Sequence, residues 1–366
     1  MRPRLLDRML VVEVIGYLTF GVALFTTILV AMIELQPLTS AVVQNGVPLW
    51  TAVKIFGLSL PGFMAMAFPM SMLLSTLLAF GRLSGDSETT ALVAAGVSYY
   101  RMAVPITIIG VVVSLMALTF NEVIAPVATQ AKNHLYNVAL SASAPTKHAF
   151  HFQQVVDGHV VFTLDADNYD SETKKLIRPK VITYSTSGAP IGIAWAAWGR
   201  WRGGMTWDLH QGYTEILTKD APGLPVQFSV LQTSVGVSLD QFLMASTDPG
   251  ALTYRQLQRR IRREEKENPD SFDVRSDLTA LYAKLSIPFA SVVFALIGFP
   301  LGVRRQRSGG AFGFALSIGI IFVYYLIYQY TTVVASNGGM APILGAWIPD
   351  VLGLVAGMIL LRRVAS

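Results

Sequence analysis

Long stretches without a charged residue dominate both ends of the chain. Residues 14–33, 55–81, 102–121, 285–303 and 308–349 contain no Asp, Glu, Lys or Arg. A helix needs about 20 apolar residues to cross roughly 30 Å of hydrocarbon, so each of the first four stretches is long enough for one crossing. The fifth is long enough for one crossing, a turn and the start of another, which residues 351–361 complete. We therefore predict a polytopic α-helical membrane protein with six transmembrane helices in a 3+3 arrangement, over 12–34, 54–81, 101–122, 285–303, 310–335 and 342–361.

The middle of the chain changes to the pattern of β-strands. Stretches rich in β-branched and aromatic residues are separated by turn signals such as Asp157-Gly158 and Pro222-Gly223. The predicted strands occupy 159–165, 180–186, 191–198, 205–210, 213–218 and 226–239. Several short strands at this spacing favour a sandwich or a jelly roll. Four tryptophans (Trp195, Trp198, Trp201 and Trp207) line a lipid-binding interior or form an ordinary core, and both interpretations remain open.

Two further helices follow from local signals. Asp86, Ser87 and Glu88 are residue types that begin helices, and they predict a short helix at about 84–97, lying at the membrane surface. Thr253 and Gln256 have the spacing of a capping box, and a strongly charged helix follows them, which faces solvent or contacts anionic headgroups. The predicted domains are 1–122 for the first three membrane helices, 123–250 for the β-rich domain, 251–284 for the polar helix and connector, and 285–366 for the last three membrane helices.

The positions of the basic residues predict the orientation in the membrane. Basic residues in short loops stay on the cytoplasmic side, whereas long translocated domains are exempt from this rule. With the N-terminus inside, the two short outside segments, 34–54 and 336–342, carry only Lys54. The inside segments then hold Arg2, Arg4, Arg8, Arg82, Arg101, Arg304, Arg305, Arg307, Arg362 and Arg363. We therefore expect both termini in the cytoplasm and the β-rich domain outside. Because this orientation accounts for the basic residues, the net charge of +5 does not indicate a nucleic-acid partner.

Composition and motifs give no sign of an enzyme. Only 14% of the residues are charged against 52% hydrophobic, and the absence of cysteine excludes thiol catalysis and thiolate metal sites. The sequence contains no G-x-x-x-x-G-K-[ST] phosphate loop, no H-E-x-x-H and no G-x-S-x-G. His148 and His151 are three residues apart but have no clear third ligand, so we predict neither a metal site nor a cofactor in this chain.

One acidic residue falls inside a predicted membrane helix. Asp350 lies about eight residues into the last one, roughly 10–12 Å from its outer end at 1.5 Å per residue. An intramembrane carboxylate suggests an ion-coupled site. The alternative, which we favour, is a carboxylate that faces the bundle interior and is hydrogen-bonded, with Tyr324, Tyr325 and Tyr328 as candidate partners.

Several short motifs together resemble the LptF/LptG (YjgP/YjgQ) permeases of the lipopolysaccharide export machine. Ser87-Glu88 followed by Ala94 and Gly96 is similar to the family's S-E-x5-A-x-G pattern in its coupling helix. The other similar motifs are Leu6-Asp7-Arg8, Asn121 with Pro126, Lys284 with Pro288, Ser336-Asn337-Gly338-Gly339 and Trp347-Ile348-Pro349-Asp350. Each motif is short, but their order and placement agree along the whole chain.

The resemblance implies a permease subunit of an ATP-driven ABC exporter. It implies a periplasmic jelly-roll-like domain, a second permease of the same family and an LptB-like ATPase dimer that binds ATP in the cytoplasm. It also implies LptC/LptA-like bridge proteins that receive lipopolysaccharide or a related lipid from the outer leaflet of the bacterial inner membrane. Ser87, Glu88, Ala94 and Gly96 are then the candidate ATPase-coupling residues, with Glu88 as the contact that transmits the ATPase motion.

One position departs from the family pattern. Many members carry a basic residue near the outer end of the first helix, where this chain has Ile33-Glu34. Lys54 or the basic 255–263 segment, including Arg259, are therefore candidate headgroup contacts, or the cargo is another lipid. Three other functions remain open: a mechanical ABC permease that carries no lipid, an ion-coupled secondary transporter that uses Asp350, and a membrane-anchored scaffold.

Overall fold

The computed structural model divides the chain into a helical unit and a β unit. The helical unit comprises residues 1–139, 249–261 and 270–366, and the β unit comprises residues 140–248 and 262–269. The structure describes residues 3–43, 46–143, 150–156, 159–170, 173, 175–185, 189–203, 206–218, 221–222, 224–234, 249–267, 272–303 and 310–365.

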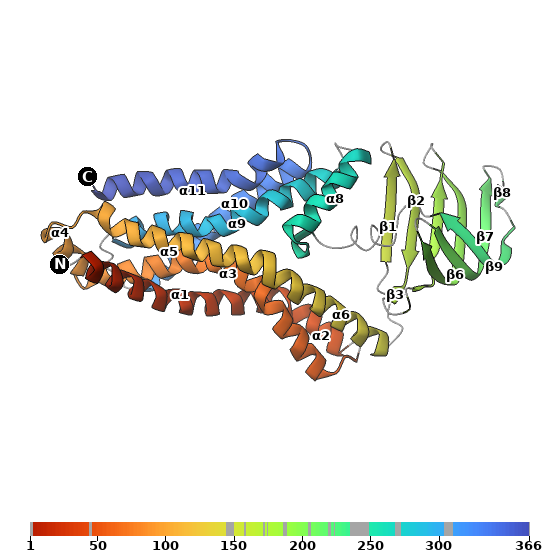
Figure 1. Ribbon diagram of the computed structural model, residues 1–366, viewed down its shortest axis with the longest axis horizontal. Coiled ribbons are helices and arrows are strands. Elements are labelled where there is room, and N and C mark those ends of the chain that lie inside the picture. The colour runs from red at the N-terminus through yellow and green to blue at the C-terminus, as the bar shows by residue number, and fades with distance from the viewer. Residues whose placement is uncertain are drawn as a thin grey trace. The chain divides into compact units, whose positions relative to one another are not determined.

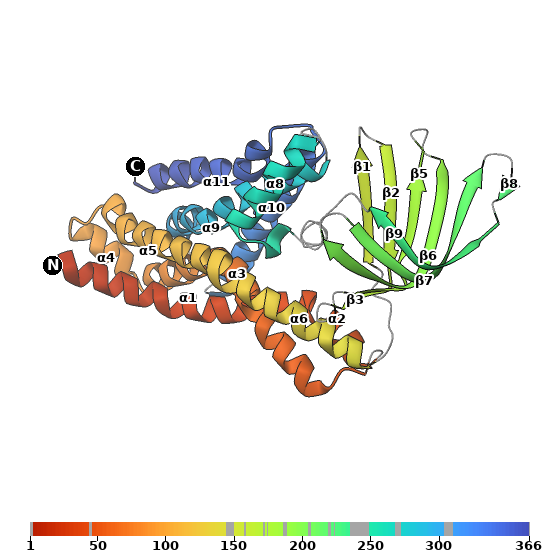
Figure 2. The same ribbon diagram turned by 45° about the vertical axis from the view of Figure 1, so that its right-hand side comes forward.

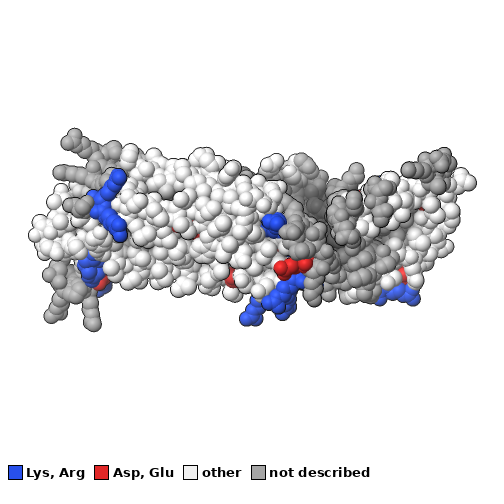
Figure 3. All heavy atoms as spheres, turned by 90° about the horizontal axis from the view of Figure 1, so that it is seen from above, with Lys and Arg blue, Asp and Glu red and all other residues white. Residues whose placement is uncertain are grey.

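Six long apolar helices form the helical unit, which confirms the predicted membrane-protein fold (Figure 1). These helices are α1 (Pro3–Ile33), α3 (Leu49–Gly85), α5 (Tyr99–Thr119), α9 (Phe272–Val303), α10 (Gly310–Ser336) and α11 (Pro342–Ala365). Each is long and apolar enough to cross a membrane. Figure 1 shows the two chain ends and the short helix α4 (Glu88–Ala94) at the same end of this unit. Figure 3 shows a face almost without charge between the charged groups at the two ends of the unit.

Helices α3 and α9 form the centre of the bundle. In each, 78% of the most apolar window is buried, against 22–39% in the other four helices. Small residues allow this close packing: a Cβ on Gly302 would lie 2.8 Å from Phe80 Cβ, and one on Gly298 would overlap Thr76. At the end of both helices the Ser84 hydroxyl donates to the Val303 carbonyl at 2.8 Å. The exposed apolar side chains of the outer helices are therefore those available to lipid or to another membrane subunit.

Shorter helices extend the bundle at both of its ends. They are α2 (Leu35–Val43), α4 (Glu88–Ala94), a π-helical turn (Phe120–Ile124), α6 (Ala125–Ser143), a 3-10 turn (Pro249–Ala251) and α8 (Tyr254–Glu267). The capping box predicted for α8 is present: the Thr253 amide donates to Gln256 Oε1 at 2.8 Å, and the Gln256 amide donates to Thr253 Oγ1 at 3.3 Å.

The predicted start of the β-rich domain at residue 123 differs from the structure. The third membrane helix continues through the π-helical turn into α6, and the first strand begins only at Phe150. Pro126, the second residue of α6, does not stop this helix, which runs on directly from the π-helical turn. Residues 272–284, predicted as connector, are likewise the beginning of α9.

The described strands of the β unit form one antiparallel sheet. Its strands are β1 (Phe150–Val156), β2 (His159–Ala166), β3 (Asn168–Asp170), β4 (Lys175–Ile177), β5 (Lys180–Tyr184), β6 (Pro190–Gly203), β7 (Thr206–Thr218), β8 (Ala221–Pro222) and β9 (Val226–Ser234). The main order is β1-β2-β5-β6-β7-β9, with the β3–β4 hairpin joined to the far half of β6 and β8 joined to β7. The predicted β insertion is confirmed, and strand follows strand along the sheet (Figure 2).

The sheet bends along a line through Arg178, Ala197 and Gln211. Arg178 (φ 47°) and Gln211 (φ 56°) adopt the left-handed conformation, and the Arg178 amide donates to the Ala197 carbonyl at 3.0 Å. The buried residues of β6 are Ala194 and Ala196 before this line and Gly199 after it, so the alternation changes phase between them. The bend therefore turns the apolar sides of both halves of the sheet toward one core.

This core answers part of the question about the tryptophans. Trp207 is fully buried in it, and Trp201 packs against it. Trp195 is exposed, and Trp198 stacks on His210 with ring centroids 3.7 Å apart. At least Trp207 therefore serves as ordinary core.

Candidate functional site

The α3–α4 turn carries the four predicted coupling residues. Ser87 adopts the left-handed conformation (φ 63°) and precedes α4, and Glu88 is its first residue. At the other end Gly96 (φ +87°) follows α4, with the Gly96 amide bonded to the Val93 carbonyl and the Val97 amide to the Leu92 carbonyl. This is a Schellman motif, in which glycine accepts the positive φ without strain. Gly96 is thus explained by the end of the helix.

One side of α4 packs on the bundle and the other is exposed. Thr89 and Leu92 are buried, whereas Thr90, Ala91, Val93 and Ala94 are exposed. Glu88 is half-buried and makes no hydrogen bond or ion pair with any residue that the structure describes. The exposed side is therefore small, mostly apolar and bordered by one carboxylate, a surface that suits close packing against another protein.

Arg82 holds the end of α3 beside this turn. Its Nε donates to Glu13 Oε1 of α1 at 2.7 Å, and its Nη1 lies 3.5 Å from Asp86 Oδ2. The α3–α4 turn is thus attached to α1 as well as to α3, so a displacement of α4 would also move these two helices.

Asp350 lies in the interior of the C-terminal helices. The carboxylate is fully buried, and its oxygens accept from the Tyr324 hydroxyl at 2.9 Å and the Ser286 hydroxyl at 2.7 Å. These two bonds join α11 to α10 and α9. Tyr328 contacts the cluster through the ring of Tyr325, at a centroid distance of 6.3 Å. The structure thus has the hydrogen-bonded interior arrangement for Asp350 and Tyr324, and it leaves Tyr328 at the edge.

The two predicted headgroup contacts are exposed side chains of the helical unit. Lys54 Nζ lies 5.8 Å from the centre of the Trp50 ring, a cation–π contact one turn apart on α3. Arg259 is exposed on α8, opposite the buried Leu257 and Ile261. The structure leaves both cations accessible.

Glu34, at the position that departs from the family pattern, is buried and paired. It accepts from the Ser59 hydroxyl at 2.9 Å, and Lys132 Nζ of α6 lies 3.4 Å away. Burial raises the pKa of the neighbouring Tyr136 hydroxyl, and the negative charge of Glu34 raises it further. The acid therefore fixes α6 against the α1–α3 pair.

A second buried pair lies where α5 ends and α8 begins. Lys284 is only 4% exposed, and its Nζ lies 3.4 Å from Glu122 Oε1 in the π-helical turn. Glu122 Oε2 accepts from the Tyr254 amide at 2.8 Å. One carboxylate thus neutralises a buried cation and caps the first turn of α8, which explains the position of that helix. Single π-helical turns of this kind occur often at functional sites.

Comparison with known proteins decides the family. A family model described as "Lipopolysaccharide export system permease LptF/LptG" matches residues 8–363. The chain belongs to the LptF/LptG family. The comparison with curated proteins gave no match.

Membership in the LptF/LptG family confirms the resemblance drawn from the motifs. It makes the chain a multi-pass membrane protein of a lipopolysaccharide export permease family, which fits transport rather than catalysis. Among the described residues there is no group of three or more His, Cys, Asp or Glu able to hold a metal. His148 and the side chain of His151 lie outside the described residues. The roles assigned to Ser87, Glu88, Ala94 and Gly96 stay predictions.

Two features of this LptF/LptG-family chain were missed at the sequence level. Lys284 was noted only as part of a motif, and its partner Glu122 was taken as the end of a membrane helix. Lys132 was assigned to the β-rich domain, so its pairing with Glu34 was not expected. The available signal was the same in both cases: a charged residue within a turn of an apolar span needs a partner.

Proposed function

We propose that this chain is one of two permease subunits of an ATP-driven exporter. The pair takes lipopolysaccharide, or a related lipid, from the outer leaflet of the inner membrane and passes it to a periplasmic bridge. ATP is hydrolysed by a separate cytoplasmic ATPase dimer, to which α4 binds. The observation that carries the proposal is the family match over residues 8–363.

Features of the helical unit support ATP hydrolysis by a separate chain. The sequence has no phosphate loop of its own, while α4 presents an exposed small-residue surface next to the half-buried Glu88. Both chain ends lie at the α4 end of the bundle (Figure 1), as expected if that end faces the cytoplasm and carries the arginines predicted to stay inside. The β unit, with its apolar core inside a bent sheet, is then the periplasmic domain.

Co-purification tests the coupling step. The Glu88→Lys variant should lose the ATPase when the complex is isolated from its native membrane, because a positive charge replaces the proposed acceptor of a charge-assisted bond. Glu88→Gln keeps the shape and should weaken the association less. Glu265→Lys, an equally drastic change at an exposed position of α8, is the control and should retain the ATPase. No ATPase with the wild-type chain would refute the proposal.

Photocrosslinking tests the passage of lipid. Photoreactive residues at exposed positions of α1 and α10 should give lipopolysaccharide adducts that disappear when ATP is hydrolysed. Adducts at none of these positions, with the ATPase still bound, would instead support the mechanical permease that carries no lipid.

A further inference from the structure

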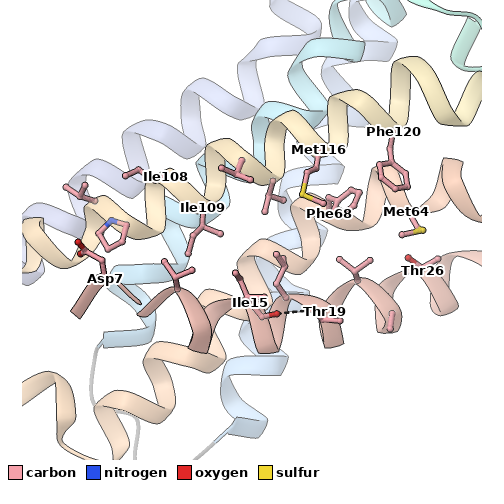
Figure 4. Close-up of a pocket in the computed structure, with 18 of the residues that line it drawn as sticks. Asp7, Ile15, Thr19, Thr26, Met64, Phe68, Ile108, Ile109, Met116 and Phe120 are labelled. Carbon is pink, nitrogen blue, oxygen red and sulfur yellow. Dashed lines mark hydrogen bonds between the residues drawn. The ribbon is translucent and has the colours of Figure 1, made fainter. Parts of the chain in front are cut away.

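An apolar groove runs along the outside of the helical unit between α1 and α5. Its volume is about 920 Å³, and α3 forms its floor. Figure 4 shows Ile15 and Thr19 of α1 on one side, Ile108 and Ile109 of α5 on the other, and Phe68 between them. The Thr19 hydroxyl donates to the Ile15 carbonyl at 3.0 Å, so it adds little polarity to the wall. The groove is thus lined almost entirely by hydrocarbon.

One end of the groove is polar. Asp7 and Arg101 both line it there, and Arg101 Nη2 lies 2.8 Å from Asp7 Oδ2. This bond uses one of the five N–H donors of the guanidinium. The other carboxylate oxygen, Asp7 Oδ1, is buried and has no hydrogen-bond partner among the described residues. The end of the groove therefore offers free donors beside a free acceptor.

The dimensions favour slender chains over a helix. From Asp7 to Thr26, the groove follows α1 for about 28 Å at 1.5 Å per residue, close to the thickness of the hydrocarbon core. Acyl chains adapt to a narrow, irregular apolar wall more readily than a helix about 10 Å wide does.

We propose that the α1–α5 groove binds a phospholipid with a zwitterionic phosphoethanolamine headgroup. The phosphate accepts from the free N–H groups of Arg101, the ammonium donates to Asp7 Oδ1, and the acyl chains extend along the groove. Under the proposed orientation, on which the assignment of the leaflet rests, this lipid comes from the cytoplasmic leaflet. It is a bound membrane lipid that braces α1 against α5, distinct from the exported cargo.

Photoreactive lipids test this inference on the full chain in its native complex. The complex is reconstituted in vesicles that contain equal amounts of phosphatidylethanolamine and phosphatidylglycerol with the same photoreactive acyl chain. Adducts mapped to α1 and α5 should favour phosphatidylethanolamine about tenfold, the value expected for one hydrogen bond to a charged group. In Asp7→Asn, which keeps an acceptor for Arg101, the two lipids should label almost equally.

A matched pair of variants distinguishes lipid bound in the groove from lipid that merely surrounds the helices. Val112 lines the groove and is 51% exposed, whereas its neighbour Val111 is 44% exposed and does not line it. Val112→Trp should reduce the phosphatidylethanolamine adducts about tenfold by filling the groove, and Val111→Trp should leave them unchanged. Equal labelling by both lipids, or equal effects of the two tryptophans, would mean ordinary contact with surrounding lipid and would overturn the proposal. A protein crosslinked in the groove would also overturn it.

The outcome is independent of the proposed export function. These adducts need neither ATP nor cargo and should persist during ATP hydrolysis, whereas the cargo adducts on α1 and α10 should disappear. Groove adducts without cargo adducts would refute export but support the bound phospholipid. Cargo adducts without groove adducts would support export and refute the bound phospholipid.

Discussion

The buried pair between Glu122 and Lys284 makes a sharp prediction about stability. Glu122→Gln retains a side-chain oxygen for the Tyr254 amide but removes the negative charge 3.4 Å from Lys284 Nζ. Lys284, at 4% exposure, cannot regain water without moving a helix. We expect this single change to weaken the helical unit more than most substitutions at its surface.

The magnitude follows from the geometry. Two unit charges 3.4 Å apart attract by about 5 kcal/mol at an effective dielectric constant near 20. Removing one partner of a buried pair typically costs about 3–5 kcal/mol, because the other charge remains buried. We expect Glu122→Gln to lower the free energy of unfolding by about 3 kcal/mol. Lys284→Met should cost only about 1–2 kcal/mol, because Glu122 is partly exposed and keeps its backbone hydrogen bond.

A double-mutant cycle in mild detergent measures the coupling. Reversible unfolding of the full chain with increasing SDS, followed by circular dichroism, gives the four free energies. The double variant should be more stable than Glu122→Gln alone, with a coupling of at least about 2 kcal/mol. Glu265→Gln, at an exposed position of α8, is the control and should change little. Strictly additive effects, or a Glu122→Gln variant as stable as wild type, would refute the assignment of a buried charge pair.

Three further predictions concern packing, the intramembrane acid and the cap of α8. Gly298→Ala should destabilise the chain by about 2 kcal/mol through overlap with α3, whereas Gly57→Ala, with no atom within 4 Å of the new Cβ, should be neutral; equal effects would exclude close packing as the cause. Asp350→Asn should lose about 1–2 kcal/mol of stability but keep export activity in reconstituted vesicles, and abolished transport would favour the ion-coupled alternative. Thr253→Ala should cost about 1 kcal/mol and increase hydrogen exchange in the first turn of α8; unchanged exchange would contradict the capping role.

The six membrane helices were predictable because their signal is purely local. A stretch without charge and of sufficient length needs no knowledge of its neighbours, so α10 and α11 were located to within a few residues. The helix bounds outside the membrane were not predictable in this way. The predicted span ended at Glu122, where the charge-free stretch stops, but a π-helical turn carries the helix on into α6.

The β unit shows a different limit of prediction from the sequence. Residues 205–210 and 213–218 were predicted as separate strands, but β7 runs from Thr206 to Thr218 without a break. The alternation of buried and exposed residues changes phase at Gln211, whose positive φ bends the strand. A phase change looks like a turn in a single sequence. Only the continuous pairing of β7 with β6 on one side and β9 on the other distinguishes a bend from a hairpin.

In the candidate site, too, local features were predictable from the sequence and contacts between distant residues were not. The short helix that contains α4 followed from local sequence. Tyr324, Tyr325 and Tyr328 were named as candidate partners of Asp350, and of these Tyr324 donates to it. The pairs Glu34–Lys132 and Glu122–Lys284 join residues far apart in the chain and became visible only with the fold.

The pairing of Glu34 also changes the argument about cargo. An acid in place of a basic residue left two alternatives open: other cations contact the headgroup, or the cargo is another lipid. Its oxygens, however, accept from Ser59 and face Lys132, and the Glu34 side chain is only 11% exposed. A neutralised and buried acid presents little negative charge to a headgroup, so this departure gives no physical reason to exclude the family's substrate. The exposed cations Lys54 and Arg259 remain able to contact a phosphate, which the photocrosslinking experiment on α1 and α10 would reveal through the identity of the bound lipid.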